Sequence, residues 1–171
     1  MAYWFDYQCP YCRQEEKNML PRLIADYVDA GKLRIIFKDF QFLGADSGTA
    51  ALMGRAVWAA NPEKFKEWHE AMFDHQDGEN SGWGSKADIL ALTKSIAGID
   101  EGKVEELLAK NSLIYQQAID ASLSEGNAMG VSGTPSFIVG KRFISGAVPY
   151  EQFRKLVDAA LPPATSAMQS Q

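Results

Sequence analysis

Cys9 and Cys12, separated by two residues, are the only thiols in this 171-residue chain. They lie where an extended apolar segment changes to a helical one, so Cys9 is expected at the start of a helix. Unsatisfied backbone N–H groups and the positive end of the helix dipole favour a thiolate there. The thiol pKa, about 8.5 in a reference peptide, falls to roughly 3.5–7.5 at such sites. This placement predicts redox chemistry.

The two thiols are expected to have different roles. Cys9 is predicted to be the nucleophile, and Cys12, one turn later, the resolving thiol, with exchange through a mixed disulfide. Pro10 suits the first helical position, where a missing N–H costs little. Tyr11, the other central residue, is expected to modulate helix dipole exposure and hydrogen bonding at the Cys9 sulfur.

A zinc site is the alternative for two cysteines at this spacing. Zinc usually takes four ligands, and the chain offers no further cysteine and only His69 and His75 in a distant segment. We therefore expect no metal site. No cofactor is expected beyond the redox-active Cys9–Cys12 disulfide.

Composition sets broad limits. The length and a 46% hydrophobic content suit one domain with a buried core. The net charge of −5 leaves no basic stripe, so nucleic acid is not an expected partner. No apolar run approaches the roughly 20 residues that span a bilayer. The first apolar stretch, Ala2 to Phe5, is too short for a secretory leader, so either a leader has been removed or the protein stays inside.

Residues 2–7 are predicted to form a buried strand, residues 10–29 a helix kinked at Pro21 and ended by Gly31, and residues 33–40 a second strand. A strand–helix–strand unit of this length implies parallel pairing. Helices alone are predicted from 47 to 128. Their boundaries are an N-cap at Ser47, a break at Asn61-Pro62, a capping box from Ser85 to Asp88, and two last helices over about 101–110 and 112–128. Strands 136–139 and 142–144 then flank a Gly140-Lys141 turn, and a helix covers about 150–161.

This order predicts an α/β, thioredoxin-like fold with a mixed central sheet and an inserted all-helical subdomain. The fold core would comprise residues 1–46 and 129–161, the helical insertion residues 47–128, and a flexible tail residues 162–171. Three motifs in this order, FDYQCPYC, FKDF and GVSGTPSFIVG, resemble those of the DsbA-like thiol:disulfide oxidoreductases. Such relatives usually have one more strand before residues 2–7, which suggests that the sequence is a piece of a longer protein.

The resemblance implies that the Thr134–Pro135 bond is cis and faces the active-site disulfide. Thr134 would present its backbone to an extended substrate, and Gly133 would allow the close approach of that substrate. The implied function is an oxidase that donates its disulfide to cysteine-containing folding proteins. It would be a monomer in the periplasm or another extracytoplasmic space, reoxidised by a membrane-bound partner. A cytoplasmic reductase or glutathione-linked enzyme, and a non-catalytic binding module, are the alternatives.

The sequence also departs from the family pattern. Relatives often carry a buried glutamate, thought to help move the proton of the second thiol, where this chain has Tyr3. Lys38, Asp6 and Asp39 are candidates for that proton transfer or tuning. In the simpler interpretation, Lys38 and Asp39 are solvated at a strand end and Asp6 makes local hydrogen bonds.

Aromatic residues are frequent in the predicted helical block. Helical spacing predicts core positions for four of them: Trp58, Phe65, Trp68 and Phe73. Trp83, between two glycines, is the better candidate for a peptide-contacting surface.

Overall fold

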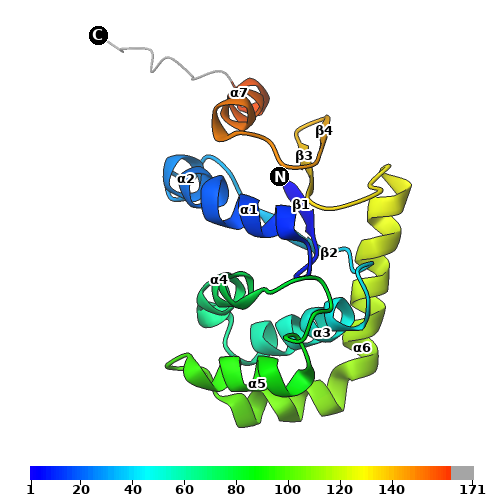
Figure 1. Cartoon of the computed structure of the whole chain (residues 1–171). Helices are drawn as coiled ribbons and strands as arrows, with labels where there is room; N and C mark the ends of the chain where they lie inside the picture. The colour runs from blue at the N-terminus through cyan, green and yellow to red at the C-terminus, as the bar shows by residue number, and fades with distance from the viewer. Residues whose placement is uncertain (163–171) are drawn as a thin grey trace.

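The computed structural model describes residues 1–162 (Figure 1). Its elements, in chain order, are β1 (Ala2–Phe5), α1 (Pro10–Asn18), α2 (Leu20–Leu23), a π-helical turn (Ile24–Val28), β2 (Ile36–Asp39), α3 (Ala45–Ala60), a 3₁₀ turn (Pro62–Lys64), α4 (Phe65–His75), α5 (Lys86–Ser95), α6 (Glu101–Ala128), β3 (Ser136–Val139), β4 (Arg142–Ser145) and α7 (Tyr150–Ala160). The predicted tail falls almost entirely on residues 163–171, which lie outside the described residues.

The sheet is mixed, as predicted, with the strand order β2-β1-β3-β4. β1 pairs in parallel with β2, with Tyr3 opposite Phe37, and antiparallel with β3. β3 and β4 form the predicted hairpin, in which Gly140 has a φ of +60° that favours glycine. The predicted strand over 33–40 is regular only from Ile36 to Asp39.

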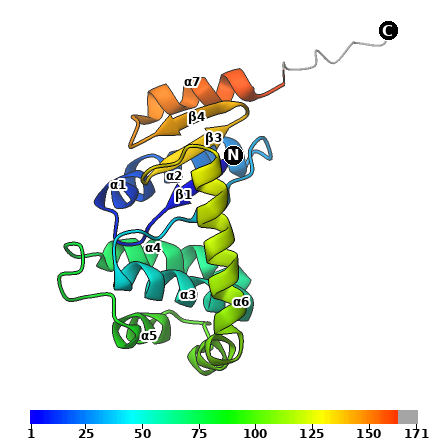
Figure 2. The same cartoon turned by 90° about the vertical axis from the view of Figure 1, so that its right-hand side faces the viewer.

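Strand alternation divides the core between the two faces of the sheet. Tyr3 and Phe5 belong to a large apolar cluster that includes residues of α1, α2 and α7, whereas Trp4 belongs to a separate cluster with Phe40 and Val131. Figures 1 and 2 show α1 and α2 on one side of β1 and the upper part of α6 on the other. Cys12 lies in the first cluster, so its thiol is part of the main core.

The C-terminal turns of α6 attach the helical block to the second face of the sheet. The Trp4 indole Nε1 donates to the carbonyl of Ser122 over 3.2 Å. Gly126 lies directly against this ring, because a Cβ atom placed there would be 2.9 Å from Trp4 Nε1. The predicted insertion thus contributes one wall of the thioredoxin-like core.

The long helix predicted over 10–29 is interrupted as expected. α1 ends at Asn18, α2 carries Pro21 in its first turn, and a π-helical turn follows from Ile24. Gly31, with a φ of +68°, ends the segment. The turn that carries the cysteines is therefore separated from the rest of the segment by a break at Met19.

Two predicted helix boundaries are wrong. α3 begins at Ala45, after Gly44, so Ser47 lies inside the helix and is not its N-cap. The buried Ser47 hydroxyl donates to Asp6 Oδ1 over 2.6 Å, which is a tertiary contact. The two predicted helices over 101–110 and 112–128 are one continuous helix, α6, because Asn111 can continue a helix and its amide reaches Tyr115 one turn later. The Ser85–Asp88 capping box is confirmed.

Three of the four predicted core aromatics pack inside. Trp68 and Phe73 are fully buried and Phe65 is packed against the core. Trp58 is 57% exposed, so its predicted core position is wrong. Its ring packs edge to face on Phe65 and lines the cavity beside β2 instead. Trp83 stacks on His75 with ring centroids 5.8 Å apart.

Candidate active site

The Cys9–Cys12 turn joins β1 to α1. Cys9 occupies the N-cap position with an extended backbone, and Pro10 takes the first helical position as predicted. The Cys9 N–H donates to the carbonyl of Asp6 over 3.1 Å, which fixes the turn before the helix begins. Both thiols are free, with 4% of the Cys9 surface and none of the Cys12 surface exposed. The Tyr11 side chain between them is 61% exposed.

The electrostatic difference between the two thiols is large. A hydrogen bond from the Cys12 thiol is the largest cause that lowers the Cys9 pKa to about 6, and the Thr134 hydroxyl and the N–H groups of Cys12 and Tyr11 add to it. Burial raises the pKa of Cys12 well above its usual range. The predicted direction for Cys9 is confirmed, but the neighbouring thiol contributes more than the helix N-terminus does. These shifts favour the thiolate form of Cys9 and the protonated form of Cys12 near neutral pH.

The loop before β3 closes over Cys9. The Thr134–Pro135 peptide bond is cis. The Cys9 Sγ atom lies 3.2 Å from the Thr134 carbonyl oxygen, to which the protonated form of the thiol donates, and the Thr134 hydroxyl is buried in the same loop. The N–H of Gly146 donates to the Pro135 carbonyl over 2.8 Å and fixes the loop to the end of β4. Space beside Gly133 is open, since a Cβ atom there would meet nothing within 4 Å.

Two glutamines that the sequence analysis did not single out hold the turn in place. The buried amide of Gln76 donates to the carbonyls of Tyr7 and Cys9 over 2.6 and 3.1 Å. Gln8 accepts from the N–H of Asn80 over 3.0 Å. Both contacts bring the loop after α4 against the active-site turn. No sequence signal marks Gln76, because its position in a polar loop resembles that of any solvated glutamine.

Asp6 makes one local hydrogen bond, to Gln8, as the simpler interpretation expected, but its other three donors come from distant parts of the chain. Its carboxylate is fully buried and accepts from the N–H groups of Gln8, Phe42 and Leu43, and from the Ser47 hydroxyl. With four donors satisfied, this carboxylate connects the β1 end to the loop after β2 and to α3. The Asp6 backbone also forms a hydrogen bond that lowers the pKa of the Cys12 thiol. Burial raises the same pKa and has the larger effect.

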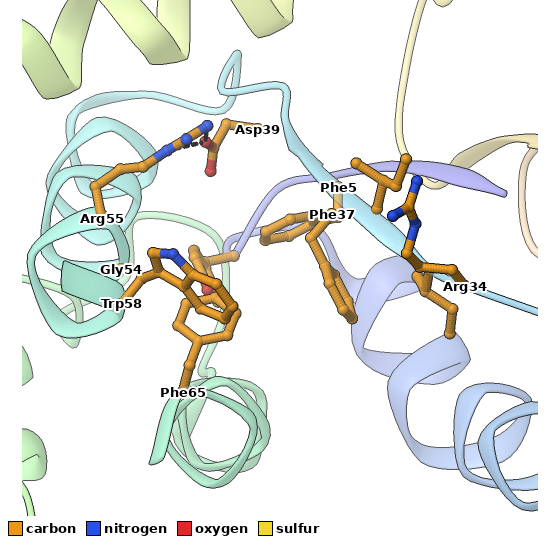
Figure 3. Close-up of a pocket in the computed structure, with 11 residues that line it drawn as sticks. Phe5, Arg34, Phe37, Asp39, Gly54, Arg55, Trp58 and Phe65 are labelled. Carbon is orange, nitrogen blue, oxygen red and sulfur yellow. Dashed lines mark hydrogen bonds and ion pairs between the residues drawn. The ribbon is translucent and has the colours of Figure 1, made fainter. Parts of the chain in front are cut away.

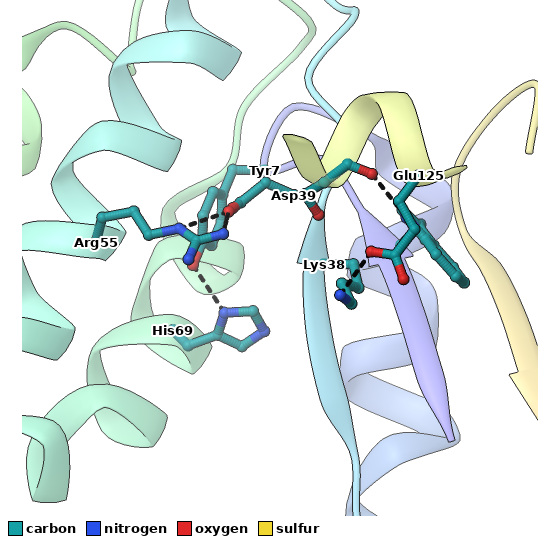
Figure 4. A network of polar contacts seen from close by, with 8 residues as sticks. Tyr7, Lys38, Asp39, Arg55, His69 and Glu125 are labelled. Carbon is teal, nitrogen blue, oxygen red and sulfur yellow. Dashed lines mark hydrogen bonds and ion pairs between the residues drawn. The ribbon is translucent and has the colours of Figure 1, made fainter. Parts of the chain in front are cut away.

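Lys38 and Asp39 are both engaged in ion pairs. The Lys38 ammonium lies 2.7 Å from Glu125 Oε2 on α6, and Asp39 is bound by the Arg55 guanidinium of α3 (Figure 4). Strand alternation sends Lys38 to the face of Trp4, opposite the face of Tyr3 that packs with Cys12. The structure thus does not bring the Lys38 side chain together with the cysteines, and neither residue is freely solvated.

A buried polar chain links β1, α4 and α1. The Tyr7 hydroxyl lies 2.8 Å from His69 Nδ1 (Figure 4). On the other side of the ring, His69 Nε2 lies 2.9 Å from Glu16 Oε1. Burial raises the Tyr7 pKa well above its usual range, so Tyr7 stays neutral. Across residues 1–162, no group of three or more His, Cys, Asp and Glu side chains is placed to hold a metal ion.

A cavity of about 450 Å³ lies beside β2, between it and α3 (Figure 3). Phe5, Phe37 and Phe65 form much of its wall, Arg34 lies toward one end, and Arg55 with Asp39 toward the other. Neither cysteine nor the Thr134–Pro135 loop lines it. This cavity is separate from the redox centre.

Comparison with known proteins agrees with this geometry. A family model described as Thioredoxin matches residues 1–159. Disulfide bond formation protein D of Bacillus subtilis (strain 168) is 27% identical over 156 residues, which cover 91% of this chain and 69% of that protein. The crystal structure of the thiol-disulfide exchange protein alpha-DsbA2 from Wolbachia pipientis is 31% identical with a TM-score of 0.81, covering 92% of this chain and 79% of that one. The crystal structure of a periplasmic thioredoxin-like protein from Salmonella enterica serovar Typhimurium is 26% identical in sequence, with a TM-score of 0.70. The match covers 93% of this chain and 82% of that one.

Within residues 1–162, no helix is both long enough and apolar enough to cross a bilayer.

Proposed function

Because this chain belongs to the Thioredoxin family over residues 1–159, we propose that its Cys9–Cys12 pair works as an oxidase, donating a disulfide to cysteine-containing proteins. The chain is a protein-disulfide oxidoreductase, similar to proteins named for disulfide bond formation and thiol-disulfide exchange. The observation that carries the direction is the stabilised Cys9 thiolate, with a pKa of about 6, beside a protonated and fully buried Cys12. A stabilised thiolate favours the reduced form, so the disulfide is a better oxidant.

The exchange begins when a substrate thiolate attacks the Cys9 sulfur of the disulfide. The new bond joins the substrate sulfur to Cys9, the Cys9–Cys12 bond breaks, and its electron pair passes to Cys12. A second substrate thiolate then attacks the first substrate sulfur and releases the Cys9 thiolate. The hydrogen bonds that lower the Cys9 pKa make it a good leaving group in this second step.

Substrate would lie along the Thr134–Pro135 loop. The Thr134 carbonyl, which the Cys9 thiol contacts at 3.2 Å, can accept an N–H from an extended peptide in the manner of an added strand. Proline at position 135 has no N–H to pair with a strand of the protein itself. Open space beside Gly133 and the exposed Tyr11 ring leave room for the peptide.

An extracytoplasmic location accords with this activity, because disulfides persist in oxidising compartments. One similar protein is described as periplasmic. A membrane-bound oxidant that accepts the electrons of the reduced Cys9–Cys12 pair would complete the cycle.

The equilibrium reduction potential against a glutathione buffer tests the direction. An oxidase is expected to have a potential above the roughly −180 mV of protein disulfide isomerase. A potential near the roughly −270 mV of thioredoxin would overturn the oxidase proposal and favour the reductase.

Trapping the mixed disulfide tests the roles of the two thiols. Cys12→Ser is expected to accumulate a covalent adduct between Cys9 and a disulfide-bonded peptide, because the Cys9 thiolate attacks the peptide disulfide and releases one peptide thiol. Mass spectrometry without reductant detects the adduct. Cys9→Ser, the matched control, should form none. Equal adduct formation by both variants would contradict the assignment of Cys9 as nucleophile, and absence of adduct in both would favour a non-catalytic module.

A further inference from the structure

The peptide groups on both sides of Cys9 are held by hydrogen bonds. The Cys9 N–H donates to the Asp6 carbonyl over 3.1 Å, and the Cys9 carbonyl accepts from the N–H of Arg13 over 3.2 Å, the bond that begins α1. The same carbonyl accepts a second hydrogen bond, over 3.1 Å, from the side-chain amide of Gln76. Because the Cys9 backbone is fixed in this way, rotation about its Cα–Cβ bond is the freedom that remains to the sulfur.

Gln76 is the one of these partners that comes from the helical block. It follows the last residue of α4 and is only 5% exposed. Its amide also donates to the Tyr7 carbonyl over 2.6 Å, and its own carbonyl accepts from the Arg13 guanidinium over 3.0 Å. A side-chain amide has two N–H donors, so both are used on carbonyls of the active-site turn.

α4 also holds the side chain of Tyr7, two residues before Cys9. The Tyr7 hydroxyl is neutral and donates to His69 Nδ1 over 2.8 Å (Figure 4). Its ring packs on Trp68 and Phe73, with centroids 5.6 and 5.2 Å away. The hydroxyl, ring and carbonyl of one residue are thus held by α4 and the residue that ends it.

These contacts bear on the Cys9 anion, because the groups that stabilise it lie in the same turn. They include the N–H groups of Tyr11 and Cys12. Hydrogen bonds weaken steeply as their angle departs from linear, so these N–H groups act on the sulfur only while the peptide groups keep their orientation. Apolar packing on α4 restrains the position of the turn, whereas a buried amide with two directional bonds also restrains its orientation.

We propose that Gln76 is a positioning residue for thiol-disulfide exchange, which fixes the peptide groups around Cys9 from the end of α4 so that the sulfur keeps facing the N–H groups of Tyr11 and Cys12. The proposal rests on the exchange reaction described above. Gln76 acts through the backbone, since both of its N–H donors are bound to carbonyl oxygens. The helical block is then part of the redox centre.

The test is the pH dependence of Cys9 alkylation in the reduced protein. Gln76→Met keeps the length of the side chain and removes both N–H donors, so the Cys9 pKa should rise from about 6 by roughly one unit, the size of about one lost hydrogen bond to the anion. A less stabilised thiolate favours the disulfide roughly fivefold at pH 7, which makes the reduction potential about 20 mV more negative at about 30 mV per tenfold change. Gln76→Asn, shorter by one methylene, should shift both quantities in the same direction by less.

Thr93→Val is the matched control. It removes another buried hydrogen bond of α4, the 2.9 Å bond from Trp68 Nε1 to Thr93 Oγ1, which does not involve the active-site turn. Like Gln76→Met, it should lower the free energy of unfolding in urea, but it should leave the Cys9 pKa near 6.

An unchanged Cys9 pKa in Gln76→Met, or an equal shift in Thr93→Val, would show that Gln76 supports only the fold and would overturn the proposal. Where Gln76→Met does not fold, Gln76→Asn takes its place, and an unchanged pKa there has the same meaning. A native protein that does not exchange with a disulfide-bonded peptide, or whose potential is near that of thioredoxin, would count against the proposed function instead, because this test compares variants with the native protein.

Discussion

Cys9 and Cys12 are three residues apart in the chain but lie in different environments. Cys9 receives hydrogen bonds that stabilise its anion, whereas Cys12 is enclosed by the core and stays protonated. The Thr134 hydroxyl belongs to this chemistry, because it is buried and lowers the pKa of both thiols. A side chain from the loop before β3, far from Cys9 in the chain, thus helps to set the Cys9 pKa.

Thr134→Val should raise the Cys9 pKa from about 6 by roughly one unit, since a hydrogen bond to a charged group is worth about 1.5–3 kcal/mol and other donors remain. The pH dependence of Cys9 alkylation measures this. Thr134→Ser keeps the hydroxyl and should leave the pKa near that of the native protein. An unchanged pKa in Thr134→Val would mean that the hydroxyl does not reach the thiolate.

At the scale of elements, α6 shows how packing overrides local preference. Gly126 is unfavourable in a helix interior by about 1 kcal/mol relative to alanine, yet it lets α6 approach the Trp4 ring. A methyl group there would be 2.9 Å from Trp4 Nε1 and 3.0 Å from Phe40, both within the buried second cluster. Close packing against the sheet therefore explains this glycine.

Gly126→Ala should destabilise the protein by roughly 1–2 kcal/mol, because overpacking costs about 1–3 kcal/mol and the gain in helix propensity offsets up to about 1. Urea unfolding measures the change. Gly102→Ala in the first turn of the same helix is the matched control: its nearest neighbour would be Asp100 Oδ1 at 3.5 Å, so it should be neutral or stabilising. Equal stability of the two variants would contradict the close contact.

At the scale of the whole molecule, the helical block and the thioredoxin-like core meet at the redox centre. Gln76 and Asn80, from the loop between α4 and α5, bind the segment that carries Cys9, and α6 covers the second face of the sheet. Folding of the whole chain therefore sets the thiol pKa values, and the redox state and the free energy of unfolding are linked.

This linkage predicts how pH changes the stability difference between the reduced and oxidised protein. The folded Cys9 pKa of about 6 is below the unfolded value of about 8.5, so the reduced protein gains stability as pH rises from about 6 to 8 and loses it as pH falls through 6. The oxidised protein lacks the Cys9 titration, because that sulfur is held in the disulfide. Urea unfolding of the reduced and oxidised forms from pH 5 to 8 measures the difference between their free energies of unfolding. A difference that does not change with pH would contradict a stabilised Cys9 thiolate.

The sequence alone determined the place of Cys9 at a helix start, the order of elements and the fold class. These follow from local rules: a thiol before Pro10 at a helix start, alternation in β1, and glycines at turns such as Gly140. The break near Pro21 and the Ser85 cap are likewise local and were predicted from neighbours in the chain.

Only the tertiary structure decided which distant groups surround the thiols. Gln76 acquires its place from packing between elements far apart in sequence, which no local pattern encodes. Lys38 was misplaced for the same reason, because its Glu125 partner lies 87 residues away in the chain. Local chemistry follows from sequence spacing, whereas desolvation and pairing depend on which surfaces the fold brings together.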